Sequence, residues 1–133
     1  MASKNANIED AHQEALIAWA RTKKATSKYK VIDLLYAIPN GGKRGKLEAI
    51  RLKKQGVKAG VSDLNFPLPA HGKPGLWIEM KKPKVRGDKS PPKVSEAQAA
   101  WLTKMDDLGH ATAVCFGWTE AVIIIENYLE GTL

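Results

Sequence analysis

The spacing of apolar residues near the start of the chain predicts a long first helix. Apolar side chains recur every three or four positions between Ile8 and Ala20, which is the repeat of an α-helix with one buried side. We expect this helix to run from Ile8 to Lys24 and residues 1–7 to fray. Glu9 falls at the edge of the apolar stripe, close enough to the buried side to take part in a site.

Shorter stretches have the composition and alternation of β-strands, at residues 31–38, 60–67, 75–81 and 111–116. The stretch from Gly75 to Lys81 is the most informative. Successive side chains of a strand point to opposite faces, so Trp77, Glu79 and Lys81 share one face while Leu76, Ile78 and Met80 share the other. A loop of proline and glycine joins the second stretch to the third, so we expect residues 60–81 to form a hairpin.

Further helices are expected at residues 43–55, from the Ser95 N-cap to Gly109, and at residues 120–129. Gln98 follows Ser95 at the capping-box spacing. Residues 82–94 contain prolines and many basic side chains, which exclude regular structure and predict a mobile basic loop. The order of elements is therefore αβαββαβα, in one domain that spans residues 1–133.

Charge and composition narrow the functional classes. The chain has 133 residues and a net charge of +7, which favours a polyanionic partner such as nucleic acid or an anionic surface. A single cysteine, Cys115, excludes a disulfide framework and a multi-cysteine zinc site. The chain shows no signal peptide and no apolar run long enough to span a membrane, so we expect a cytoplasmic protein. A membrane-surface role is disfavoured because no helix is both strongly basic and broadly apolar.

Two acids and a lysine in the expected hairpin suggest phosphodiester chemistry. Asp63 and Glu79 lie on adjacent strands and offer two carboxylates to one hard cation such as Mg²⁺. We expect Mn²⁺ to substitute for Mg²⁺. The Met80 carbonyl supplies a third oxygen, and Lys81 orients or activates the attacking water. An isolated Glu-x-Lys is more often an exposed ion pair, and the second carboxylate at Asp63 is what favours the metal site.

A basic surface is expected between the first strand and the hairpin. The Pro-Asn-Gly-Gly turn presents backbone N–H groups that suit an anion, although a plain tight turn would have the same sequence. The helix after it is strongly basic, which indicates contacts with phosphates or simply a solvated face. The candidate DNA-binding residues are Asn40, Gly41, Gly42, Lys43, Arg44, Lys53 and Lys58.

The set of motifs resembles a known family. The matching pieces are Glu9-x-x-x-Gln13 with Trp19; Ile38-Pro39-Asn40-Gly41-Gly42 and Arg44; residues 53–64; residues 75–81; Ser95-x-x-Gln98; and Gly117-Trp118-x-Glu120-Ala121. Together they resemble the PD-(D/E)xK nuclease superfamily, and more narrowly its stand-alone virus-type replication-repair nuclease (VRR-NUC) domains of phages and bacteria. Two features depart from the family: Ser62 stands where proline usually precedes the first acid, and residues 82–94 are longer and more basic than expected.

The resemblance implies an αβββαβ core, with a mixed sheet flanked by helices in the α/β (α+β) class, and a metal-dependent endonuclease. It implies Glu9 as a helix acid near the metal, with Glu14 as the fallback, and it implies Gln98 as a supporting polar residue. Stand-alone members are associated with homodimers that cut branched DNA, including four-way (Holliday) junctions, in DNA repair. The alternatives are a monomeric flap or single-strand nuclease and a catalytically inert basic DNA-binding protein.

Overall fold

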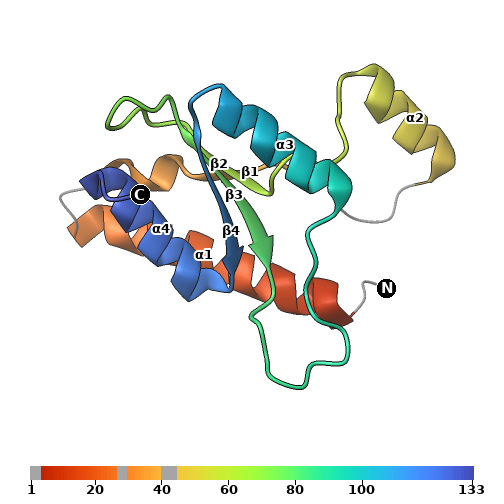
Figure 1. Ribbon diagram of the computed structural model, residues 1–133, viewed down its shortest axis with the longest axis horizontal. Helices are drawn as coiled ribbons and strands as arrows, with labels where there is room; N and C mark the ends of the chain where they lie inside the picture. Colours follow the sequence, from red (N-terminus) through yellow and green to blue (C-terminus); the bar gives the residue numbers. More distant parts are fainter. Residues whose placement is uncertain (1–3, 27–29, 40–44) are drawn as a thin grey trace.

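The computed structural model describes residues 4–26, 30–39 and 45–133. The elements follow the predicted order, with one short 3₁₀ helix added (Figure 1). They are α1 (Lys4–Thr26), η1 (Lys30–Leu34), β1 (Tyr36–Ala37), α2 (Lys46–Lys54), β2 (Leu64–Phe66), β3 (Leu76–Lys81), α3 (Glu96–Asp107), β4 (Ala111–Phe116) and α4 (Trp118–Glu130).

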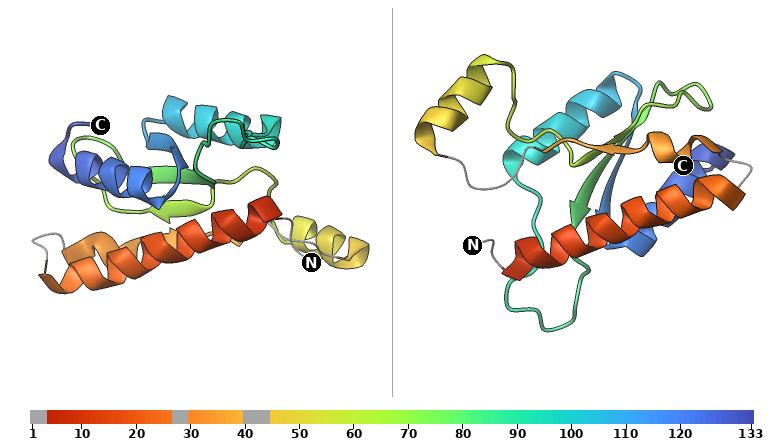
Figure 2. Two further views of the ribbon diagram at one scale, coloured as in Figure 1. Left: turned by 90° about the horizontal axis from the view of Figure 1, so that it is seen from below. Right: turned by 180° about the vertical axis from the view of Figure 1, so that it is seen from behind.

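The strands form a four-stranded mixed sheet in the order β1-β2-β3-β4. The first two pairings are antiparallel, and β3 pairs with β4 in parallel. Helices flank the sheet, and Figure 2 shows α1 and α3 on its opposite sides. The predicted class, a mixed sheet between helices, is confirmed. The β2–β3 hairpin has Leu64 opposite Ile78, and this register positions the candidate site.

The alternation of β3 divides the molecule into a core side and a polar side. Leu76, Ile78 and Met80 are buried in one cluster with residues of α1 and α4, because those helices cover this face with apolar side chains. The phenyl ring of Phe66 contacts the ring of Tyr128 edge-on at 6.1 Å. The opposite face of β3 lies under α3, where the Trp77 and Trp101 rings pack edge-on at 5.3 Å.

The start of α3 is fixed by a capping box, as predicted. The Gln98 N–H donates to Ser95 Oγ at 3.2 Å, and the Ser95 N–H donates to Gln98 Oε1 at 2.8 Å. The loop between α2 and β2 approaches the first turn of α3 closely at Gly60, whose φ is +86°. A Cβ atom there would lie 2.4 Å from the carbonyl carbon of Ala97, so only glycine permits this contact. The contact holds the first turn of α3 against the chain that leads to Asp63.

The predicted strand at residues 31–38 is wrong over most of its length. Residues 30–34 form η1, and only Tyr36–Ala37 is a strand. Ile32 and Leu35, three residues apart, are both buried, and the Leu35 N–H donates to the Ile32 carbonyl at 3.2 Å. A turn of three residues directs both side chains to the core and leaves Asp33 exposed, whereas a strand would place them on opposite faces.

Several boundaries also differ from the predictions. Helix α1 begins at Lys4, so residues 4–7, which were expected to fray, are helical. Strand β2 is limited to Leu64–Phe66, and α4 begins at Trp118. Residues 82–95 contain no helix or strand, as predicted. Helix α2 stands apart from the sheet with no buried residue (Figure 1). Within the described residues, no helix has the length and apolar character needed to cross a bilayer.

Candidate active site

The hairpin brings Asp63 and Glu79 side by side. The paired register ends at Leu64 opposite Ile78, and one step further Asp63 stands opposite Glu79 on the polar face. Asp63 Oδ2 accepts a hydrogen bond of 2.7 Å from the Met80 N–H. Its backbone carbonyl accepts from the Ile38 N–H at 2.8 Å. Asp63 therefore joins β3 through its side chain and the end of β1 through its backbone.

Glu79 is a buried acid with one unsatisfied oxygen. Its residue is 1 % exposed, and its Oε2 accepts from Gln98 Nε2 at 3.3 Å. Its Oε1 is buried and receives no hydrogen bond from any described donor. Burial, followed by the neighbouring Asp63 carboxyl, raises the pKa of Glu79 to about 9. Folding therefore favours the protonated form of Glu79 in the absence of a metal.

Lys81 and Glu79 are connected through Gln98. Lys81 Nζ donates to Gln98 Oε1 at 3.0 Å, and the other end of the same amide donates to Glu79. Lys81 is only 8 % exposed, so its amine is held within the cluster. Because Gln98 Oε1 also closes the capping box, the first turn of α3 fixes the amide that joins the acid to the amine.

Glu9 reaches the same cluster from α1. Its carboxylate accepts a hydrogen bond from the Lys82 backbone N–H. Burial is the largest cause that raises the pKa of Glu9, Lys81 opposes the shift, and the Asp63 carboxylate adds to it. Glu14, the fallback, is exposed on α1. The structure therefore brings together Glu9, Asp63, Glu79, Lys81 and Gln98.

The cluster offers a hard cation two carboxylate ligands, and not a set of three side-chain ligands. Among the described residues, no three side chains of histidine, cysteine, aspartate or glutamate stand close enough together to hold a metal ion by themselves. The paired acids and the unsatisfied Glu79 Oε1 are nevertheless the oxygen donors that Mg²⁺ or Mn²⁺ accepts. An ion at this place would complete its shell with a backbone oxygen, for which Met80 is the candidate, and with water.

The candidate DNA-binding residues divide into two groups. Lys53 lies in α2 and Lys58 follows it, and both are exposed. Asn40, Gly41, Gly42, Lys43 and Arg44 lie outside the described residues.

The sequence reasoning missed a set of contacts between α1 and the loop after β3. Lys82 Nζ pairs with Asp88 Oδ2 at 2.7 Å and donates to Asn5 Oδ1 at 2.9 Å. Asn5 Nδ2 donates to Ser90 Oγ at 3.0 Å, and the Ser90 N–H donates to Asp88 Oδ1 at 2.9 Å. The only signal in the sequence was an asparagine on the same side of the helix as Ile8, which does not identify a distant partner.

Comparison with known proteins gives a consistent result. A family model described as "VRR-NUC domain" matches residues 6–118. A solved structure described as a "VRR_NUC domain protein" superposes with a TM-score of 0.72 at 26 % sequence identity, over 92 % of this chain and 88 % of that one. A search of curated proteins finds no match.

Proposed function

Because the chain belongs to the VRR-NUC family, and its domain is therefore a nuclease of the PD-(D/E)xK type, we propose that it is a Mg²⁺-dependent endonuclease that cuts branched DNA as a homodimer. The family's nucleases are metal-dependent in general. The observation that carries the proposal is the pairing of Asp63 with Glu79, whose buried Oε1 lacks a donor among the described residues.

The side chains around this pair have separate roles in the proposal. Asp63, Glu79 and the Met80 carbonyl would hold the ion, which would stabilise negative charge on the scissile phosphate and lower the pKa of a water. Lys81, fixed by Gln98, orients the attacking water and screens the charge that develops. Glu9, at the edge of the cluster, accepts a hydrogen bond or proton from a bound water.

The choice of substrate follows from charge and symmetry. A net charge of +7 favours a polyanion, and the exposed side chains of Lys53 and Lys58 add positive charge at the surface. A four-way junction is two-fold symmetric, so a symmetric dimer with two sites would match it. The stand-alone members that this sequence resembles support the same assignment.

A cleavage assay tests the proposal directly. Labelled four-way junctions, flaps and linear duplexes are incubated with Mg²⁺, Mn²⁺ or EDTA, and we expect junction cleavage with either ion and none with EDTA. Asp63→Asn should reduce the rate about a hundredfold or more. Asp107→Asn, on the exposed end of α3, serves as the matched control and should cut at the wild-type rate.

The outcomes separate the alternatives. If neither wild type nor Asp63→Asn cuts any substrate with Mg²⁺ or Mn²⁺, the nuclease proposal fails and the inert DNA-binding protein becomes the better interpretation. Cleavage of flaps by a protein with monomeric mass in sedimentation would favour the monomeric nuclease.

A further inference from the structure

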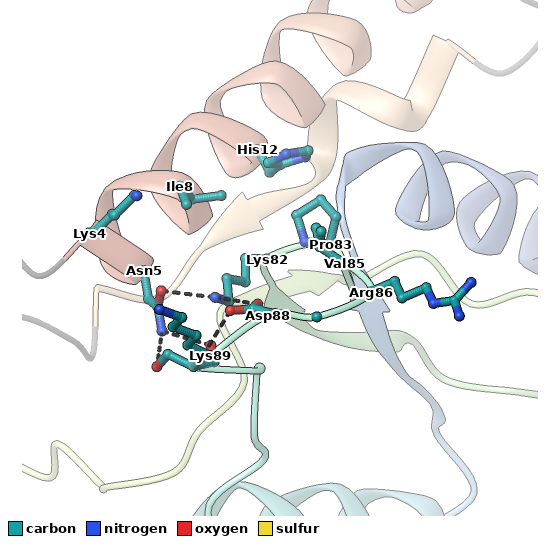
Figure 3. Close-up of a pocket in the computed structure, with 12 residues that line it drawn as sticks. Lys4, Asn5, Ile8, His12, Lys82, Pro83, Val85, Arg86, Asp88 and Lys89 are labelled. Carbon is teal, nitrogen blue, oxygen red and sulfur yellow. Dashed lines mark hydrogen bonds and ion pairs between the residues drawn. The ribbon is translucent and has the colours of Figure 1, made fainter.

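A cavity of about 500 Å³ opens between the first turns of α1 and the loop that follows β3 (Figure 3). Its size falls in the range of small-molecule sites. It lies next to the candidate active site, because its lining residues Ile8 and Lys82 are the chain neighbours of Glu9 and Lys81, and the Lys82 N–H donates to Glu9.

The outer wall of the cavity is held in place. Lys82 is 6 % exposed and joins Asp88 of the loop to Asn5 of α1, as the dashed lines in Figure 3 show. Asn5 Nδ2 in turn donates to the backbone carbonyl of Ser90 at 3.3 Å and to Ser90 Oγ at 3.0 Å. The cavity is therefore formed before any ligand arrives.

The inner surface is apolar and carries one oriented aromatic ring. Ile8, Pro83 and Val85 line it together with His12. His12 Nδ1 accepts from the Trp118 N–H at 3.1 Å, so the hydrogen of the ring is on Nε2 and the ring plane is fixed. Gly117 adopts a φ of +100°, which favours glycine, and a Cβ there would crowd Pro83 Cγ at 3.2 Å.

Most of the charged side chains in the lining are cationic. Lys4, Arg86 and Lys89 line the cavity, and the single acid, Asp88, is already paired with Lys82. A ligand with a flat apolar part and a negative group would satisfy both surfaces. A nucleotide has this combination, because its base stacks on histidine or arginine planes and its phosphate attracts cations.

We propose that this cavity binds one unpaired nucleotide of the DNA substrate, with the base against His12 and Pro83 and the phosphate near Lys4 and Lys89, which lie on the same side of the cavity (Figure 3). The inference rests on the proposed function and deepens it. A paired base must first be unpaired and unstacked, which costs free energy, so the cavity favours DNA with an unpaired nucleotide beside the active site. It gives the enzyme a means of recognising flaps and other branches that carry an unpaired nucleotide, whereas recognition of a fully paired four-way junction rests on the two-fold symmetry of the dimer.

Blocking the cavity tests the inference without relying on catalysis. Affinity is measured in EDTA for a paired duplex and for the same duplex carrying an unpaired branch with a fluorescent adenine analogue. Wild type should bind the branched DNA more tightly and change the fluorescence of the analogue. Val85→Trp, at a residue 64 % exposed, should fill the cavity and lower affinity for the branched DNA about tenfold while leaving duplex affinity unchanged.

Two further variants keep the test decisive. Ile123→Trp, at a residue 57 % exposed on α4, adds the same ring elsewhere and should bind both DNAs as wild type does. Lys89→Ala should lower the branched-DNA affinity in the same direction, and it replaces Val85→Trp if circular dichroism shows that variant to be misfolded.

Each outcome bears on the idea in a defined way. Equal affinities of wild type for the two DNAs, or equal losses on both DNAs in the cavity variants, would overturn it. A branch preference that disappears only in the cavity variants supports it, even if no DNA is cut when Mg²⁺ is added. In that case the nuclease proposal fails and the binding site remains.

Discussion

At the scale of single residues, Glu79 shows how one acid can be both costly and useful. Its burial makes the charged form unfavourable, and Gln98 supplies a donor to only one of its oxygens. A divalent cation would repair both deficits, because it favours the ionised carboxylate and occupies the unsatisfied oxygen. A bound metal and a proton would therefore compete for the same carboxyl group.

This competition predicts a pH-dependent stability that Glu79→Gln removes. The pKa of Glu79 rises from 4.5 to about 9 on folding. Its contribution to the stability of the folded state is therefore fully present below pH 4.5 and is lost as the pH rises toward 9. In EDTA, the free energy of unfolding of wild type should fall by up to ~1.4 kcal/mol per pH unit across that interval. Urea denaturation at a series of pH values should give a flatter curve for Glu79→Gln.

Mg²⁺ provides the complementary measurement. It should restore the stability of wild type at the alkaline end of the range and have little effect on Glu79→Gln, because the amide offers no charge to the ion. Glu126→Gln, on α4, is the control and should follow wild type. Parallel curves for wild type and Glu79→Gln in EDTA would contradict the assignment of the buried proton to this residue.

At the scale of elements, the sequence predicts those whose residues are determined by neighbours along the chain. The alternation from Leu76 to Lys81 identifies β3, and Ser95 with Gln98 identifies the start of α3. Residues 31–38 mislead because β-branched and aliphatic residues favour a strand, while the core demands Ile32 and Leu35 on one side.

The part of the candidate site that local sequence patterns determine was predictable, and the part that depends on distant contacts was not. Asp63, Glu79 and Lys81 are placed by alternation and a hairpin, both of which are local patterns. The contact of Asn5 with Ser90 spans 85 positions, and no local rule pairs an asparagine with one particular serine so far away. The cavity that depends on it was therefore visible only in three dimensions.

The contact at Gly60 predicts a large effect of one methyl group. Gly60→Ala adds a Cβ that collides with Ala97 and also strains a positive φ, so it should lower the free energy of unfolding by about 2–4 kcal/mol. Gly56→Ala is the matched control, since its φ is +102° with no atom within 4 Å, and it should cost only about 1 kcal/mol. Urea denaturation measures both, and equal losses would show that backbone strain alone is responsible.

At the scale of the whole molecule, α2 is the element least explained by the fold. It has no buried residue, and Leu47 is 84 % exposed at its start. A helix of this length gains most of its stability from packing, so one that extends from the body needs a partner. Its basic side chains suit the DNA backbone that the proposed function requires.

Neutralising α2 should weaken DNA binding in a way that depends on salt. Replacing Lys53 and Lys54 with alanine should lower affinity for every DNA tested and reduce the slope of log affinity against log salt by about 1 for each lysine that contacts a phosphate. Lys104→Ala, on the exposed side of α3, is the control and should leave the slope unchanged. Fluorescence anisotropy over a range of salt concentrations gives the slopes, and an unchanged slope would remove α2 from the interface.

Cys115 gives these experiments a practical advantage. The thiol is fully buried in β4, and burial raises its pKa to about 12, so the folded protein presents no reactive sulfur at neutral pH. A maleimide dye would therefore label a cysteine introduced on α2 and leave Cys115 unreacted, so Cys115 would not have to be replaced first. In denaturant the native thiol becomes reactive, and its rate of alkylation would report how often β4 separates from β3.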